Sequence, residues 1–349
     1  MSNFHSLVIS EVKQETPNSV SIALEIPDQL SEIFQFKAGQ YITFKHLHQG
    51  EELRRAYSIC SSPKSGEIRV GVKKVKDGNF SVYANTQLKA GDSLEVMEPE
   101  GHFIFEPTVS KQAHYAAFAA GSGITPVLSI IKEVMEREPE STFVLVYGNK
   151  TLKEAMFYSE LEALKNQYTN RFKIEYIFSR SKEHNALQGR IDRSVVNYLL
   201  KNKYGESQFS TYFLCGPEAM INEVSETLQE RGVSKEQILF ELFTSSEEGE
   251  LTESHDGNTK ITITLDDETE SFVMSQKQSV LDAALDQGLD APFSCQGGIC
   301  STCIARVKKG KVEMRKNQIL TDSELEEGLV LTCQSHPTTA TLEIDYDDV

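Results

Sequence analysis

The segment Cys295-Gln-Gly-Gly-Ile-Cys300-Ser-Thr-Cys303 places three cysteines in the spacing C-x4-C-x2-C, and Cys333 follows further along the chain. Four thiolates in this pattern suit a 2Fe–2S cluster, with three ligands from one loop and the fourth from a distant strand. Zinc sites more often use two C-x2-C pairs, and only one such pair is present here. Zinc and free thiols stay open as alternatives. We predict an iron–sulfur centre held by Cys295, Cys300, Cys303 and Cys333.

Two glycines lie inside this loop, Gly297 and Gly298. A loop that wraps an inorganic core needs positive φ angles and a close approach of the backbone, and glycine permits both. The amides of such a loop can then point at the cluster and stabilise its negative charge. We expect both glycines to serve this geometry.

Acidic residues are concentrated around and beyond this loop. Residues 244–349 contain 8 basic and 21 acidic residues, against 27 and 31 in residues 1–243. The segment 244–258 (TSSEEGELTESHDGN) is rich in acids, serines and glycines, so we interpret it as a solvated linker. It precedes a C-terminal module at 259–349. The acids of this end either steer an electron acceptor or keep the module soluble.

The whole chain has 349 residues and a net charge of −17. Its length predicts two or three domains. The acidic surplus argues against nucleic acid or an anionic membrane surface as the main partner. No window approaches ~20 uninterrupted apolar residues, and the first ten residues lack the basic start and apolar core of a signal peptide. We expect no membrane insertion and a cytoplasmic location.

Two different patterns precede the linker. Residues 1–108 contain short β-branched or alternating segments separated by turns, with one helix at 78–90, which predicts an antiparallel barrel or sandwich. Residues 109–243 alternate apolar runs with amphipathic helices, which predicts a parallel sheet covered by helices on both faces. The strands expected in the first part are 6–12, 19–25, 40–45, 55–59, 68–75 and 93–97. The second part is expected to have strands at 114–120, 142–147, 173–179, 211–214 and 237–243, with helices at 126–136, 152–165, 218–230 and near 195–202. The C-terminal module is expected to have strands at 260–265, 270–274 and 341–345 and a helix at 280–287.

One strand of the first part carries the sequence Arg55-Ala56-Tyr57-Ser58. An Arg, an aromatic and a hydroxyl on one side of a strand can hold a flavin: the Arg pairs with the pyrophosphate, the aromatic packs on the ring and the hydroxyl lies near its reactive nitrogen. Alone this pattern is weak, because Tyr and Ser are ordinary strand residues. Downstream, the segment from Gly78 to Ser81 precedes the helix, where backbone amides can take a phosphate.

A glycine turn, Gly121-Ser-Gly123-Ile124-Thr125-Pro126, follows an apolar strand and opens a helix. Such a turn offers free amides to a pyrophosphate, and proline suits a first helical turn. A later strand of the same sheet ends in Cys215-Gly216-Pro217. The simplest interpretation of Cys215 is a small buried residue.

The residues after the third apolar strand bear on which nicotinamide nucleotide is bound. Ser179 and Arg180 end that strand, and Arg190 follows. A site for a free 2′-hydroxyl more often has an Asp or Glu here, whereas Arg and Ser supply charge-assisted donors for a 2′-phosphate. We therefore favour NADPH over NADH, although surface arginines are common and Glu183 is close by.

Together these motifs resemble the ferredoxin–NADP reductase superfamily, followed by a plant-type ferredoxin domain. The resemblance implies an FAD-binding β-barrel (1–108), an α/β nicotinamide-binding domain (109–243) and an α+β, β-grasp 2Fe–2S domain (259–349). The common ferredoxin loop has a basic residue where this chain has Gln296, which puts the local potential in doubt. The resemblance further implies that Cys215 adjoins the nicotinamide, and that Phe243 either covers the flavin or belongs to the core. The remaining cofactor-binding residues that it implies are Val72, Lys73, Gly78, Phe80 and Ser81.

This order of domains is similar to that of the reductase components of bacterial oxygenases. The resemblance implies electron flow from NADPH to FAD, to the cluster and then to a partner oxygenase, with a phenylacetyl-CoA epoxidase-type di-iron enzyme favoured. Ser58, Cys215 and Glu241 are expected to polarise or position the reactants. A fatty-acid desaturase or a ring-hydroxylating dioxygenase is the alternative acceptor, docking on the acidic ferredoxin domain. A redox or iron sensor without an acceptor is the alternative of another class.

Overall fold

The computed structural model describes residues 4–108, 112–243, 251, 255 and 257–349. Most of the predicted linker, 244–258, therefore lies outside the described residues. Contacts group most of the first two parts of the chain into one compact unit, and the C-terminal module, with Phe4 and Arg54–Ala56, into another. Within the described residues, no helix combines the length and apolar character needed to cross a bilayer.

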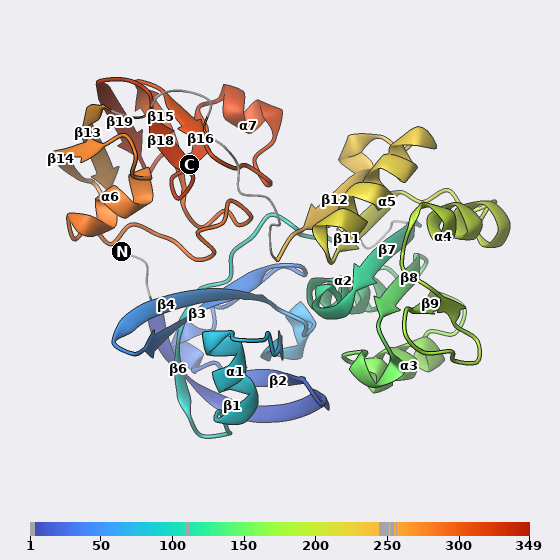
Figure 1. The fold of residues 1–349 in the computed structure, drawn as a ribbon. Helices are drawn as coiled ribbons and strands as arrows, with labels where there is room; N and C mark the ends of the chain where they lie inside the picture. The colour runs from blue at the N-terminus through green and yellow to red at the C-terminus, as the bar shows by residue number, and fades with distance from the viewer. Residues whose placement is uncertain (1–3, 109–111, 244–250, 252–254, 256) are drawn as a thin grey trace. The chain divides into compact units, whose positions relative to one another are not determined.

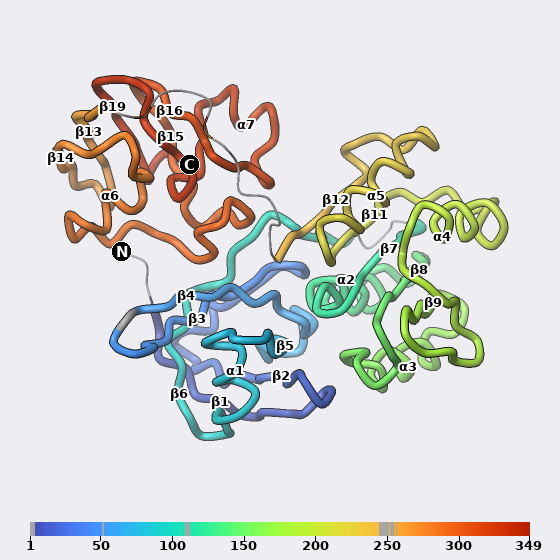
Figure 2. Tube along the Cα trace, in the orientation of Figure 1, coloured from blue at the N-terminus to red at the C-terminus, as the bar shows by residue number. Residues whose placement is uncertain are grey.

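The first part is the predicted antiparallel barrel. Its six strands are ordered β4-β3-β6-β1-β2-β5. The chain just after β4 closes the sheet, because Ile59 forms a bridge with Val70 of β5 and the Cys60 amide donates to the Arg69 carbonyl at 2.8 Å. The single helix α1 packs against β2 and β5 (Figure 2). The elements are β1 (Phe4–Thr16), β2 (Ser19–Glu25), β3 (Tyr41–His48), β4 (Glu51–Ser58), β5 (Ile68–Lys73), α1 (Asn79–Thr86) and β6 (Ser93–Met97), with short 3-10 turns at Asp28–Leu30 and Pro63–Ser65.

The second part is the predicted parallel sheet, ordered β10-β9-β8-β7-β11-β12. Helices α2 and α3 share one apolar cluster with one face of this sheet, and α4 and α5 pack together on the other face (Figure 1). The strands are β7 (His114–Ala120), β8 (Thr142–Asn149), β9 (Phe172–Phe178), β10 (Leu187–Gln188), β11 (Thr211–Cys215) and β12 (Ile238–Glu241). The helices are α2 (Ile124–Arg137), α3 (Tyr158–Gln167), α4 (Arg193–Tyr198), continued by a π-helical turn (Leu199–Lys203), and α5 (Glu218–Glu230).

One predicted helix of this part is wrong in its extent. The expected helix 152–165 is divided into a 3-10 turn (Leu152–Glu154) and α3. The break is at Phe157, whose φ of 57° lies in the left-handed region, where a helix cannot continue. Its side chain is buried in the core, so packing offsets the local strain. Further 3-10 turns cover Gly121–Gly123 and Lys235–Gln237.

The C-terminal module has a mixed five-stranded sheet ordered β14-β13-β19-β15-β17 and a separate β16–β18 pair. Strands β13 and β19 are parallel, and the other neighbouring strands of the sheet are antiparallel. Ile261 and Ile263 alternate with threonines in β13 and are buried. Its elements are β13 (Asn258–Leu265), β14 (Glu268–Ser275), α6 (Val280–Asp286), β15 (Ile304–Lys309), β16 (Val312–Met314), α7 (Asp322–Glu326), β17 (Leu329–Leu331), β18 (Ser335–Pro337) and β19 (Thr341–Asp345).

Candidate functional site

The four cysteines of the C-terminal module are arranged as two pairs. Cys295 and Cys300 hydrogen-bond to each other, and so do Cys303 and Cys333. Among the described residues, no group of side chains converges as a single metal ion would require. Two pairs of thiols suit a two-iron cluster better than one zinc ion, because each iron of a 2Fe–2S centre takes two cysteines.

Backbone amides of the loop point at these sulfurs. The Gly297 amide donates to Cys295 Sγ at 3.3 Å, and the amide of Gly298 bonds to Cys333. The Cys300 thiol and the amides of Gly297, Ile299 and Cys300 lower the pKa of Cys295 to about 6, against the opposing effect of burial. The pKa of Cys333 is also lowered, first by the Cys303 thiol, whereas the pKa values of Cys300 and Cys303 are raised well above their ordinary value. The surroundings therefore favour one thiolate, the form that binds iron, in each pair.

The structure corrects two expectations about this loop. Of the two glycines, only Gly298 has a positive φ, 71°, and a Cβ on it would lie 2.9 Å from the Lys316 carbonyl oxygen. Gln296, which is not a glycine, also has a positive φ. Gly297 contributes its amide and does not need the left-handed region. Cys333 lies in the turn between β17 and β18 and not on a strand.

Sequence reasoning missed a polar side chain beside the fourth cysteine. Gln334 Nε2 donates to the Gln296 carbonyl at 2.9 Å and lies 3.7 Å from Cys333 Sγ. The side chain thus links the turn that carries Cys333 to the loop that carries Cys295. A lone glutamine gives no sequence signal for this contact.

Ser58, Glu241 and Cys215 come together in the other compact unit. Ser58 Oγ donates to Glu241 Oε2 at 2.8 Å, across 183 positions of sequence. Cys215 is directly opposite Glu241 in the register of β11 and β12. Burial raises the pKa of Glu241 to about 8, although the Ser58 hydroxyl opposes the shift. Burial, and then Glu241, raise the pKa of the Cys215 thiol well above its ordinary value.

The expected common face of Arg55, Tyr57 and Ser58 is wrong. Neighbouring residues of a strand point to opposite sides, so Tyr57 and Ser58 have different partners. The Tyr57 ring lies 5.4 Å from that of Phe80 and 5.8 Å from that of Phe44, whereas Ser58 reaches Glu241. Arg55 is exposed, and Ala56 is half-buried.

The start of α1 is open to a ligand. Gly78 is its N-cap, and no side chain of the described residues caps the first amides of the helix. A Cβ on Gly78 would lie 2.5 Å from Ser81 Oγ, which accepts a hydrogen bond from the Val75 amide. Ser81 therefore closes the turn between β5 and α1. Free amides at the start of a helix favour a phosphate group.

The two turns of the parallel sheet pack directly on each other. A Cβ on Gly123 would lie 2.1 Å from the Cys215 carbonyl oxygen, and one on Gly216 would lie 3.1 Å from the Cβ of Ala120. The helix α2 starts at Ile124, two residues before the expected start, and Thr125 and Pro126 are buried in its first turn. Its N-cap is a glycine, which has no side chain to bond the first amides.

A basic pocket of about 410 Å³ lies beside the Gly121 turn. A Cβ on Gly121 would lie 3.3 Å from Lys73 Nζ. Burial lowers the pKa of Lys73; Glu154 opposes this shift and Lys150 adds to it. Val72 is buried in the same strand. The charged residues that line the pocket are Lys73, Lys74, Lys76, Asp77, Lys150 and Glu154.

The structure places Ser179, Arg180 and Arg190 at the carboxyl edge of the parallel sheet. The amides of Ser179 and Arg180 donate to the carbonyls of Asn149 and Lys150, at 3.0 and 2.8 Å. Arg190 follows β10, which is parallel to β9, so it lies beyond the same edge. Both arginines are exposed, and Ser179 is half-buried. Phe243 is half-buried and packs against the apolar cluster of this part.

Comparisons with known proteins match each part of the chain. Family models described as an oxidoreductase FAD-binding domain, an oxidoreductase NAD-binding domain and a 2Fe-2S iron-sulfur cluster binding domain match residues 6–105, 118–226 and 263–338. The chain is 40% identical over 352 residues to one of the subunits of 1,2-phenylacetyl-CoA epoxidase from Escherichia coli (strain K12), covering 99% of each chain.

Proteins with lower sequence identity also match almost the whole chain. The ferredoxin reductase component of 3-ketosteroid-9-alpha-monooxygenase from Rhodococcus rhodochrous is 30% identical over 354 residues, 97% of this chain and 96% of that protein. The solved structure of phthalate dioxygenase reductase shares the fold, with a TM-score of 0.61 at 22% identity and 98% of both chains covered.

Fold and sites together define an oxidoreductase with FAD-binding, nicotinamide-binding and 2Fe–2S domains. The chain belongs to the ferredoxin–NADP reductase superfamily, among the oxygenase reductase components that end in a plant-type ferredoxin domain.

Proposed function

We propose that this reductase takes electrons from NADPH and passes them through FAD and a 2Fe–2S cluster to a separate oxygenase. The observation that carries this proposal is the contact between Ser58 of the barrel and Glu241 of the parallel sheet, next to Cys215. It brings the predicted flavin strand and the predicted nicotinamide turn to one place. When bound, FAD takes the two electrons of the coenzyme together and releases them singly, and the cluster carries one at a time.

The side chains of this contact hold protons and shape the site. Because the pKa of Glu241 is about 8, its carboxyl group is mostly protonated at pH 7 while Oε2 accepts the hydrogen bond from Ser58. Cys215 stays a neutral thiol, since burial disfavours the thiolate. These groups fit polarising and positioning roles, because none of them is an activated nucleophile.

Phosphate groups of the two nucleotides have separate places. The uncapped start of α1, at Gly78, suits the FAD pyrophosphate. The Gly121–Gly123 turn and the Lys73 ammonium suit the coenzyme pyrophosphate, because amides and a cation meet there.

The preference for NADPH rests on the basic carboxyl edge of the sheet, at Ser179, Arg180 and Arg190. The experiment compares kcat/KM for NADPH and NADH in the wild type and in Arg180→Ala. We expect the variant to lose mainly NADPH efficiency, by about 10- to 100-fold, because a charge-assisted hydrogen bond contributes roughly 1.5–3 kcal/mol. Arg231→Ala is the control, since Arg231 bonds to Asn197 on the exposed surface. Equal efficiency with both coenzymes in the wild type would contradict the preference.

For the acceptor we propose an oxygenase of the phenylacetyl-CoA epoxidase type that docks on the acidic C-terminal module. The 40% identity to a subunit of that epoxidase and the net charge of −13 over residues 244–349 support this proposal. Electrostatic docking weakens as the salt concentration rises, so turnover with the acceptor should be slower at high ionic strength than at low ionic strength. Turnover that is insensitive to salt would exclude electrostatic steering.

The purified protein's absorption spectrum tests the cofactors directly. Flavin and iron–sulfur bands, with iron and sulfide in the preparation, support the proposal, and a colourless protein that contains zinc contradicts it. Sustained NADPH-driven reduction of cytochrome c separates a reductase from a sensor, because a sensor need not turn over.

A further inference from the structure

Helix α2 presents one side to the chain that follows the flavin strand. Ser129, Lys132 and Glu136 are spaced three and four residues apart, so they share one face of the helix. The residues opposite are the consecutive Cys60, Ser61 and Ser62, which come directly after Ser58 and Ile59 at the end of β4. The contact joins the barrel to the parallel sheet within one compact unit.

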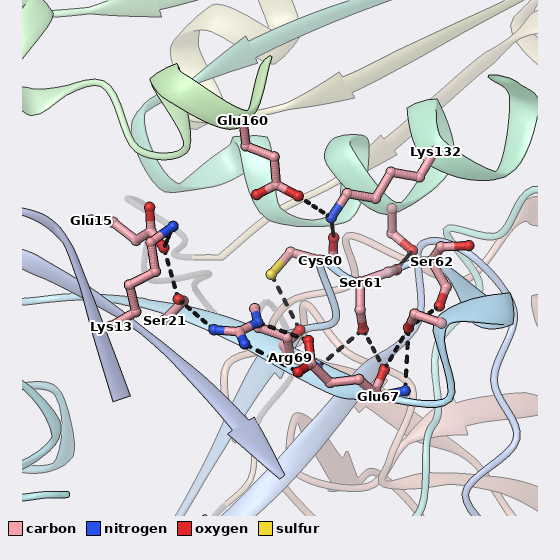
Figure 3. Close-up of polar contacts among 12 residues, drawn as sticks. Lys13, Glu15, Ser21, Cys60, Ser61, Ser62, Glu67, Arg69, Lys132 and Glu160 are labelled. Carbon is pink, nitrogen blue, oxygen red and sulfur yellow. Dashed lines mark hydrogen bonds and ion pairs between the residues drawn. The ribbon is translucent and has the colours of Figure 1, made fainter. Parts of the chain in front are cut away.

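Each residue of that face makes a short polar contact, and Figure 3 shows those of Lys132. Lys132 Nζ donates to the Cys60 carbonyl at 2.8 Å and pairs with Glu160 Oε1 of α3 at 2.6 Å. Ser129 Oγ donates to the Ser61 carbonyl at 2.7 Å. Ser62 Oγ donates to Glu136 Oε2 at 2.6 Å. The lysine side chain is only 13% exposed, so its charge depends on these partners.

The segment 60–62 is also hydrogen-bonded to the barrel. The Cys60 amide and thiol both donate to the Arg69 carbonyl, at 2.8 and 3.2 Å. Arg69 is held in turn by ion pairs with Glu11 and Glu67. Burial raises the pKa of Cys60 to about 12, so the residue stays a neutral thiol. Lys132 hydrogen-bonds to the backbone carbonyl of Cys60 and not to its sulfur.

Helix α2 begins directly after the Gly121–Gly123 turn, and Lys132 lies eight residues beyond its first residue. At a rise of 1.5 Å per residue, Lys132 lies about 12 Å along the axis of α2 from the turn. The contacts of this face are therefore among those that fix the distance between the nicotinamide turn and the end of the flavin strand.

We propose that Lys132 is a positioning residue that sets how closely the coenzyme meets the flavin. The inference rests on the proposed function, since it concerns the electron transfer between these two groups. A misplacement of about 1 Å can cost about 100-fold in rate even when binding is unchanged. Lys132 acts through the backbone of Cys60 and through α2, and it touches neither reactant.

The test is stopped-flow reduction of bound flavin by NADPH and by its 4-deuterated form, measured per flavin bound. We expect Lys132→Met to slow flavin reduction by about 10–100-fold, to leave the coenzyme dissociation constant near the wild-type value and to raise the deuterium isotope effect. Lys132→Arg keeps the charge and should recover part of the rate. Lys165→Met is the matched control, because Lys165 pairs with Glu162 on α3 alone and should keep the wild-type rate.

Two outcomes overturn the inference: a wild-type rate in Lys132→Met, or a loss of rate that follows only a loss of coenzyme binding. If that variant does not fold, Ser129→Ala removes a single hydrogen bond of the same face and should show a smaller slowing of the same kind. A wild-type rate in Ser129→Ala would then overturn it. A wild-type protein whose flavin is not reduced by either coenzyme contradicts the proposed function instead.

Discussion

The cysteine loop and the Ser58–Glu241–Cys215 contact are assembled in opposite ways. Three of the four cysteines lie within nine positions, and the loop's own amides point at their sulfurs. Ser58 and Glu241 are 183 positions apart and meet only because a barrel strand reaches the edge of a parallel sheet. The first centre is therefore a property of a local segment, and the second is a property of the packing between two domains.

The largest expected effect separates the two centres completely. Cys300→Ser removes one predicted sulfur ligand from the Cys295–Cys300 pair, so we expect loss of the iron–sulfur absorption and of essentially all NADPH-driven cytochrome c reduction. Flavin reduction by NADPH should persist, because its site lies in the other compact unit. Cys60→Ala is the control for iron content, which should stay at the wild-type level. Loss of flavin reduction in Cys300→Ser would show that the two centres are not independent.

The packed centre also makes stability depend on pH. The pKa of Glu241 is about 8 in the folded protein, against an ordinary value of 4.5, so the folded state holds a proton that the unfolded state has released between these two values. The free energy of unfolding should therefore fall as pH rises from about 5 to 8, by on the order of 4 kcal/mol from this group.

The measurement is urea unfolding of wild type and Glu241→Gln at pH 5 and pH 8. The glutamine cannot ionise, so we expect the variant to be more stable relative to wild type at pH 8 than at pH 5. An identical pH dependence in both proteins would show that Glu241 does not carry the effect.

The smallest expected effect compares one glycine from each centre. A Cβ on Gly123 would lie 2.1 Å from a backbone oxygen of Cys215, whereas a Cβ on Gly297 would meet nothing closer than 3.8 Å among the described residues. Gly123→Ala should lower the free energy of unfolding by about 3 kcal/mol and weaken coenzyme binding. Gly297→Ala should change stability by less than about 1 kcal/mol, because it keeps the backbone amide. Equal destabilisation by Gly123→Ala and Gly297→Ala in thermal unfolding would show that the two centres do not differ in how tightly their glycines are packed.

Much of the architecture was predictable because its signals are periodic. The alternation of strands and helices in residues 109–243 predicted the parallel sheet, and the turns of residues 1–108 predicted the barrel. The strands β16, β17 and β18 were missed, since three residues are too few to show a period, and the six-residue β15 was missed as well. The extent of α3 was wrong because the buried Phe157 accepts a left-handed backbone that no local pattern indicates.

The sequence by itself predicted the four cluster cysteines and determined the order of the domains, because ligand spacing and hydrophobic periodicity act over short stretches of chain. The tertiary structure decided the pairing of the four thiols, the contact of Ser58 with Glu241 and the contact of Lys132 with Cys60. These contacts join distant segments, and their geometry depends on how whole sheets and helices pack. Desolvation at such places, which raises the pKa of Glu241, exists only after folding.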